Sequence, residues 1–286
     1  MDVSQVVRDS ILRLGAKRVM LQNAKDSLKT IVLGSEQGDS AFDPAYLPGS
    51  FNLCYRSLDL KHCYYLYRRV TDLCPNLKNI VLFYSMFSPG HVLERSPDDS
   101  DIGPLVSALF ELDVEYQADN LNALAKALTR QLQDGMAATL AREAVQLDGY
   151  DGFQPADRSV APAAQFDRRV LSHIRMNYET GADYYLLKIL AIASNLGHSV
   201  HIVIPPVTGM YREAVGARSS IIFRELIEVV GSFPWRVPVK VLNAYDDEAY
   251  EDAFFVDSDH LDAHGKGTRM LSQTIADQVG ANEAAA

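Results

Sequence analysis

Cysteine is scarce in this sequence, and long apolar runs are missing. The chain of 286 residues holds three cysteines, Cys54, Cys63 and Cys74. Their number and spacing exclude a disulfide framework and a spaced zinc motif, and favour core thiols in a reducing compartment. Charges interrupt the N-terminal segment, which lacks the apolar stretch of a signal peptide, and no later run reaches the roughly 20 residues of a membrane-spanning helix. We therefore predict a cytoplasmic protein without a membrane span.

Positive charge is scarce as well. Lys and Arg number 27 against 37 Asp and Glu, so the formal net charge is −10. Nucleic-acid surfaces rely on clustered basic side chains, so we expect no nucleic-acid partner. One small basic cluster is present, which we interpret as a solvated helix face, with contact to an anionic sugar or a cofactor phosphate as the alternative. Its members are Arg56, Lys61, Arg68 and Arg69.

What the sequence does contain is a regular alternation of apolar runs and helical patterns. Continuous apolar runs are typical of strands buried in a parallel sheet, and they cover residues 30–34, 50–54, 79–85, 199–206 and 237–245. Amphipathic patterns predict helices over residues 3–27, 57–73, 180–196, 211–230 and 266–279. This alternation predicts an α/β fold with three layers, α/β/α, around a five-stranded parallel sheet.

Residues 96–165 interrupt the alternation. They begin with the helix-breaking SPDDSD, continue through the helical pattern LNALAKALTRQLQDGMAATLAREAV, and close with a loose stretch that contains Pro and Asp. We interpret residues 1–286 as one α/β domain in which 96–165 is a helical insertion between the third and fourth strands. This insertion either caps the functional site or forms a plain surface excursion.

Two motifs fall where a parallel sheet places its ligands, beyond the carboxyl ends of the strands. The first, IVLGSEQGDSAF at 31–42, ends a strand at a glycine and offers two serines. The second, FFVDSDHLDAHGKG at 254–267, follows a strand-like apolar lead and delivers Asp257 and His260 before the last helix. A carboxylate bonded to one imidazole nitrogen fixes the tautomer and leaves the other nitrogen free to take a proton. By spacing alone, helix-capping acids beside an exposed histidine are the alternative.

Several short blocks together resemble the SGNH/GDSL hydrolase superfamily, and in particular a branch linked to bacterial surface-polysaccharide synthesis. The blocks are GSEQG (34–38), FDP (42–44), FNL (51–53), SLDL (57–60), the tyrosine pair 64–65, LFYSMFSPG (82–90), IPP (204–206) and DSDHL (257–261). They span both ends and the middle of the chain but not the insertion. The resemblance implies a flavodoxin-like fold of the SGNH type and a Ser–His–Asp site for ester hydrolysis or acyl transfer to a sugar hydroxyl.

The position of the nucleophile departs from this pattern. In the superfamily the nucleophile lies two residues after the strand-ending glycine, and with Gly34 as that glycine the place belongs to Glu36. The tripeptide Gly-Asp-Ser at 38–40 lies past the strand end, and we expect Ser40 to belong to a turn. Ser35 is the better-placed hydroxyl.

The roles implied by the resemblance follow from these positions. Ser35 is the expected nucleophile, His260 the general base and acid, and Asp257 the orienting carboxylate, with Asp259 as its substitute. Backbone N–H groups after Gly34 would form the oxyanion site, which further residues line. These lining residues are Glu36, Asn52 and Ser85.

Three functions remain open at this point. The first is an esterase or O-acyltransferase acting on a carbohydrate or glycoconjugate precursor, without a metal or bound cofactor and with acetyl-CoA as a possible acyl donor. The second is a catalytically silent binding or assembly protein, because Glu36 occupies the nucleophile position. The third is a non-acyl reaction in which Glu36 and His260 exchange protons.

Overall fold

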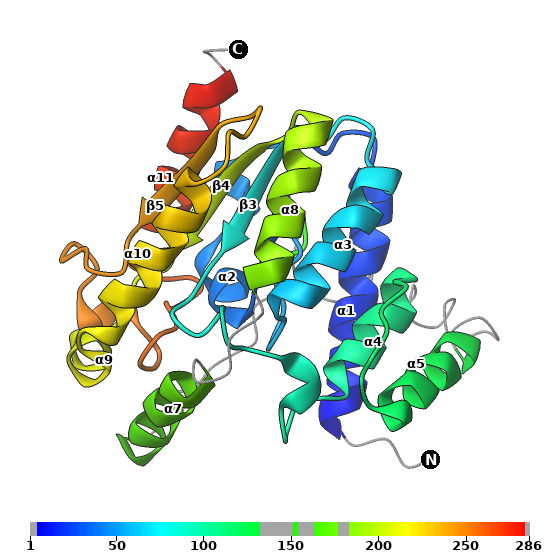
Figure 1. Cartoon of the computed structure of the whole chain (residues 1–286), viewed down its shortest axis with the longest axis horizontal. Coiled ribbons are helices and arrows are strands. Elements are labelled where there is room, and N and C mark those ends of the chain that lie inside the picture. The colour runs from blue at the N-terminus through cyan, green and yellow to red at the C-terminus, as the bar shows by residue number, and fades with distance from the viewer. Residues whose placement is uncertain (1–4, 132–150, 154–162, 177–182, 284–286) are drawn as a thin grey trace.

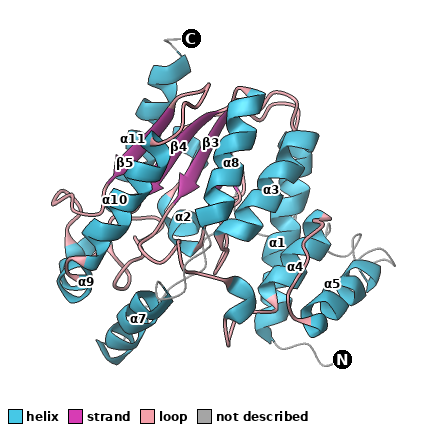
Figure 2. Cartoon of the chain, in the orientation of Figure 1, coloured by secondary structure: helices cyan, strands magenta, loops and turns pink. Residues whose placement is uncertain are grey.

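The computed structural model describes residues 5–131, 151–153, 163–176 and 183–283. Five strands form one parallel sheet in the order β2-β1-β3-β4-β5 (Figures 1 and 2). Their bounds are β1 Thr30–Leu33, β2 Ser50–Asn52, β3 Asn79–Phe83, β4 Ser199–Ile204 and β5 Val239–Asn243. The predicted five-stranded parallel sheet is therefore confirmed, with each strand inside its predicted run. The order reverses between β1 and β3, which is the switch point where such sheets bind ligands.

Helices cover both faces of the sheet, as the three-layer prediction requires. One face packs through Ile31, Leu82 and Ile202 against α1, α3, α8 and α10, and the other packs through Val32 and Val81 against α2 and α11. Their bounds are α1 Gln5–Ala24, α2 Glu36–Ala41, α3 Leu60–Leu73, α8 Asp183–Leu196, α10 Arg218–Gly231 and α11 Lys266–Glu283. Alternate side chains of one strand thus serve opposite cores, which explains the continuous apolar runs.

The segment predicted as one helix over 211–230 forms two. A short helix, α9 Gly209–Val215, precedes α10. Gly216 separates them with a φ of 59°, a left-handed conformation that glycine adopts at helix ends without steric cost. Within the described ranges, none of the helices has both the length and the apolar character needed to cross a membrane. The three cysteines are free and buried.

The predicted insertion contributes three described pieces. One helix, α4 Ile102–Phe110, lies beside α1 and α3, and a second, α5 Asp119–Gln131, packs against α4 (Figure 1). The rest of the predicted long helix, residues 132–145, lies outside the described residues. Residues 151–153 return to the sheet edge, where the Asn52 N–H of β2 donates to the Asp151 carbonyl at 2.8 Å. A further helix, α7 Ala163–Met176, begins at the end of this segment.

One lysine joins these pieces from inside the protein. Lys17 of α1 is completely buried, and its ammonium forms three hydrogen bonds. It donates to Asp39 Oδ1 at 2.8 Å, to the Asn52 carbonyl at 3.0 Å and to the Gly152 carbonyl at 2.6 Å. All three ammonium protons are therefore satisfied, and one side chain links α1, α2, β2 and the returning insertion.

Candidate functional site

The two predicted motifs meet at the carboxyl end of the sheet. The loop that follows β5 carries Asp257 and His260, and it lies beside α2, which follows β1. Gln37 of α2 donates from Nε2 to the Asp259 carbonyl at 3.2 Å, and Thr208 after β4 donates to the Ser258 carbonyl at 2.9 Å. The apolar lead predicted as strand-like is a 3-10 turn, Asp252–Phe254, followed by a single bridge between Phe255 and Leu261.

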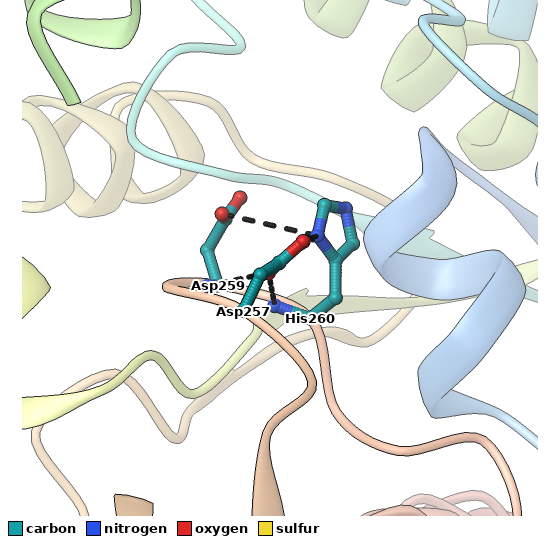
Figure 3. Close-up of side chains that lie close together, drawn as sticks. All are labelled: Asp257, Asp259 and His260. Atoms are coloured by element: carbon teal, nitrogen blue, oxygen red, sulfur yellow. Dashed lines mark hydrogen bonds and ion pairs between the residues drawn. The ribbon is translucent and has the colours of Figure 1, made fainter. Parts of the chain in front are cut away.

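Asp257 holds the ring of His260. The Nδ1 atom of the fully buried histidine lies 2.8 Å from both carboxylate oxygens (Figure 3). The same carboxylate accepts from the backbone N–H groups of Asp259 and His260 at 3.1 and 2.9 Å, because the three residues form one tight turn. Burial raises the pKa of Asp257, but the hydrogen bond from His260 and the charge of Arg169 outweigh burial, so the net shift is downward. The predicted contact is present.

The other ring nitrogen of His260 faces Arg169 of α7. The Nη2 atom donates to His260 Nε2 at 3.0 Å. A guanidinium has no acceptor atom and stays protonated, so Nε2 must carry a lone pair, and the imidazole is neutral with its proton on Nδ1. The lone pair that a general base would use is therefore engaged by Arg169.

Three carboxylates surround the same guanidinium. Arg169 Nε lies 2.8 Å from Asp259 Oδ1, Nη2 lies 3.5 Å from Glu36 Oε1, and Nη1 lies 3.6 Å from Asp257 Oδ2. Burial lowers the pKa of Arg169, but Asp259, Glu36 and Asp257 outweigh it, so the net shift is upward. The guanidinium is thus a fixed cation at the centre of the site.

Glu36 is directed toward the histidine as well. One carboxylate oxygen, Oε1, lies 3.9 Å from His260 Nε2, and the other, Oε2, accepts from the Ser57 N–H at 2.8 Å. The carboxylate of Glu36 therefore stands close to the general-base nitrogen and already uses one of the backbone donors nearby. A charged group fills the place that the superfamily pattern gives to a serine.

The two serines of the first motif are placed differently from a working nucleophile. Ser35 is buried at the start of α2, and among the described residues its hydroxyl forms no hydrogen bond, so none joins it to His260. Ser40 lies inside α2 rather than in a turn, which corrects that expectation. Its hydroxyl donates to the carbonyls of Glu36 and Gln37 at 3.1 and 3.3 Å, a common local bond for serine in a helix.

The two predicted oxyanion side chains support α2. Asn52 donates from Nδ2 to the Gly38 and Phe42 carbonyls at 3.0 and 2.8 Å, so both amide protons are engaged. Ser85 donates to Gln37 Oε1. Gly34 ends β1 with a φ of 148°, and a Cβ there would stand 2.7 Å from Phe83 Cβ, so the strand end requires glycine.

Arg169 and Gln37 were missed by the sequence reasoning. Gln37 Nε2 also donates to Asp259 Oδ2 at 3.1 Å and thereby fixes the acid that pairs with Arg169. Arg169 lies on α7, whose buried face also includes His173, bonded through Nδ1 to the Tyr211 hydroxyl at 2.7 Å. Helical periodicity could have found α7, but it does not distinguish Arg169 from its neighbour Arg168.

The basic cluster after β2 faces acidic side chains. Arg56 pairs with Asp99, and Lys61 Nζ lies 3.2 Å from Glu94. Arg69 Nη2 lies 2.5 Å from Glu111 Oε2. These ion pairs engage three of the four members of the cluster, and the fourth, Arg68, lies over the ring of Tyr64 at 5.8 Å.

A metal ion is the other cation that this site could accept. Asp257, Asp259 and His260 form a group whose possible ligand atoms all lie within 4.8 Å of one another. Carboxylate and imidazole ligands suit several divalent metals. However, the His260 Nδ1 proton is bonded to Asp257 and Nε2 accepts from Arg169, so the ring nitrogens and the cation position are both in use. The guanidinium supplies the positive charge here.

The carboxylates that pair with Arg169 predict that the folded protein loses stability at low pH. Burial raises the pKa of Asp259, but the charge of Arg169 outweighs burial, so Asp259 and Asp257 both titrate below the unfolded value of about 3.9. Their stabilisation is present above about pH 4 and is lost as the pH falls through the folded pKa values. We expect the melting temperature of wild type to fall more steeply between about pH 4 and pH 2 than that of Asp259→Asn, because the variant lacks one of the two carboxyl groups with a lowered pKa.

The control for this prediction is Asp246→Asn, which changes an exposed aspartate. It should keep the wild-type slope. Equal slopes for wild type and Asp259→Asn, measured by circular dichroism, would contradict the assignment.

Comparison with models of known protein families and with curated proteins found no match for the chain. The resemblance to the SGNH/GDSL hydrolases stays a prediction that rests on the short sequence blocks. The function must therefore be argued from the geometry around His260 and Glu36.

Proposed function

We propose that this protein is a binding or assembly component with an SGNH-like fold that is silent toward acyl esters. The observation that carries this proposal is the pair of contacts at His260 Nε2. Arg169 donates to that nitrogen at 3.0 Å, and the Glu36 carboxylate lies 3.9 Å from it. A base whose lone pair is engaged and a nucleophile position that holds an anion do not support acyl transfer.

The physical reason is that ester cleavage needs a free general base, a free hydroxyl nucleophile and free oxyanion donors at once. A positioned general base contributes about 10²–10⁴-fold in rate, and it requires the Nε2 lone pair that Arg169 uses. The hydroxyl nucleophile is absent from its expected place, because Glu36 stands there and is held by the Ser57 N–H. A negative carboxylate at that place would also repel the oxyanion. Each of these effects opposes the reaction.

An esterase or O-acyltransferase acting on a carbohydrate precursor is the second candidate, and one observation favours it. His260 and Asp257 keep the geometry of a working base and its orienting carboxylate. Acetyl-CoA would then be the acyl donor expected for a cytoplasmic transferase. This function requires Arg169 to leave His260 and Ser35 to approach it.

Ester hydrolysis distinguishes the two candidates. We expect wild type to cleave a chromogenic acetyl ester no faster than His260→Ala, because the base is engaged, and Ser35→Ala to leave the rate unchanged. The same three proteins are assayed for loss of acetyl-CoA with and without a mixture of sugars. A wild-type rate that exceeds the rates of both variants would establish the esterase or transferase instead.

A further inference from the structure

A group of four tyrosines joins α3 and α8 at the surface of the protein. The ring centroid of Tyr64 lies 5.0 Å from that of Tyr65 and 5.7 Å from that of Tyr185. Tyr184, in the first turn of α8, is 57% exposed, and its ring centroid lies 5.4 Å from that of Tyr185. We use the name tyrosine face for these four residues together with two basic neighbours, and its members are Tyr64, Tyr65, Arg68, Tyr184, Tyr185 and Lys188.

The two basic side chains of the tyrosine face lie over aromatic rings and not beside acids. Lys188 Nζ lies 4.4 Å from the centroid of the Tyr184 ring, and the Arg68 guanidinium carbon lies 5.8 Å from that of the Tyr64 ring. In the part of the chain that the structure describes, neither Arg68 nor Lys188 forms an ion pair with a carboxylate. The face therefore offers two uncompensated cations in a chain whose net charge is −10.

The outer side of α8 is also unusually apolar. Only Asp183 and Lys188 are charged among the 14 residues of this helix, and Asp183 accepts a hydrogen bond from the Tyr84 hydroxyl at 3.0 Å. Leu196, at the other end of α8, is 52% exposed. A surface helix normally carries charged side chains on its solvent side. Exposed tyrosines, apolar side chains and arginine are instead typical of protein interfaces.

The complementary charge stands elsewhere on the same chain. Five acids occur within the seven residues 246–252 of the loop after β5, all of them exposed, and none forms an ion pair with a basic side chain of the described residues. They are Asp246, Asp247, Glu248, Glu251 and Asp252, and we call them the acidic loop. Helix α10 lies between this loop (orange) and α8 (Figure 1), so the two surfaces of one chain are apart.

We infer that the tyrosine face binds the acidic loop of a second copy of this chain. The inference rests on the proposed function, because it specifies the partner of an assembly component. Opposite charges align the two surfaces, and the tyrosine rings supply apolar area that is buried on contact. Each copy carries one surface of each kind, so the contact is heterologous and copies join head to tail.

Sedimentation velocity of the full chain at increasing concentration tests this inference. We expect wild type to pass from monomers to larger species, and added salt to weaken this association because charges drive it. A face variant combines Arg68→Gln, Tyr184→Ala and Lys188→Gln, and a loop variant combines Asp246→Asn, Glu248→Gln and Glu251→Gln. Each should associate at least about tenfold more weakly than wild type. The control variant, Lys126→Gln with Arg130→Gln, changes two exposed cations of α5 and should behave as wild type.

An equimolar mixture of the face variant and the loop variant separates a head-to-tail contact from a symmetric one. The loop of the first and the face of the second are both intact, so the mixture should form a dimer and stop there. A monomeric wild type, unchanged association in either variant, or a mixture that stays monomeric would overturn the inference. Failure of the proposed function would show separately, as ester hydrolysis by wild type, whatever the state of association.

Discussion

Replacing Lys17 by alanine is expected to lower the free energy of unfolding by about 3–5 kcal/mol, because it removes a fully buried cation that is paired with Asp39. The ammonium also satisfies the carbonyls of Asn52 and Gly152, so the variant loses two further bonds. The change should reach the site as well, since Asp39 belongs to α2, which also carries Glu36. Urea unfolding measures the effect.

Arg18→Ala is the matched control, one residue along the same helix. Arg18 Nη2 lies 2.7 Å from Glu111 Oε1, but both side chains are exposed, at 38% and 51%. Exposed pairs contribute about 0–1 kcal/mol, so this variant should stay close to wild type. A loss for Lys17→Ala as small as that of Arg18→Ala would show that the buried pair does not stabilise the fold.

Combining Glu36→Ser with Arg169→Ala is expected to give the largest change in activity. The double variant places a hydroxyl at the nucleophile position and frees both His260 Nε2 and the Ser57 N–H. We expect hydrolysis of a chromogenic acetyl ester at least about a hundredfold above wild type, which is the lower range for general base catalysis. Initial rates at pH 7 to 8 (about one unit above the ordinary histidine pKa) measure the gain.

The single variants show whether the two residues act together. Glu36→Ser alone still has Arg169 on the base, and Arg169→Ala alone still has a carboxylate at the nucleophile position, so each should gain less than the pair. Adding His260→Ala to the double variant should abolish the gain. If the double variant folds and remains as inactive as wild type, then a hydroxyl at position 36 and a free His260 Nε2 are not sufficient for ester hydrolysis, which would contradict the prediction.

The strands of the sheet could be predicted because the amino-acid sequence of each strand reflects how deeply that strand is buried. Runs such as 30–34 and 199–206 are buried on both faces, so they stay apolar throughout, whereas the order of the strands was not predicted. The break between α9 and α10 was missed because one glycine inside a helical pattern is tolerated. Only the backbone conformation of Gly216 shows that it ends a helix.

The site could be predicted only where its residues are close in sequence. Asp257 and His260 share one turn, and their spacing alone indicates the hydrogen bond that the structure contains. Arg169 comes from a segment about ninety residues earlier and reaches the site only through the placement of α7, as its separation of 91 residues from His260 shows. A contact between residues far apart in sequence leaves no periodic pattern. The sequence analysis therefore did not predict that Arg169 contacts His260, and it retained acyl transfer as one of the open functions.

Reaction of wild type with a fluorophosphonate tests the central claim most directly. Such reagents modify a serine only when a free general base activates it. The intact mass of the wild-type protein, followed by peptide mapping, reports whether Ser35 reacts. We predict no adduct, because the Ser35 hydroxyl forms no hydrogen bond among the described residues and Arg169 engages His260. An adduct on Ser35 that His260→Ala abolishes would contradict the account.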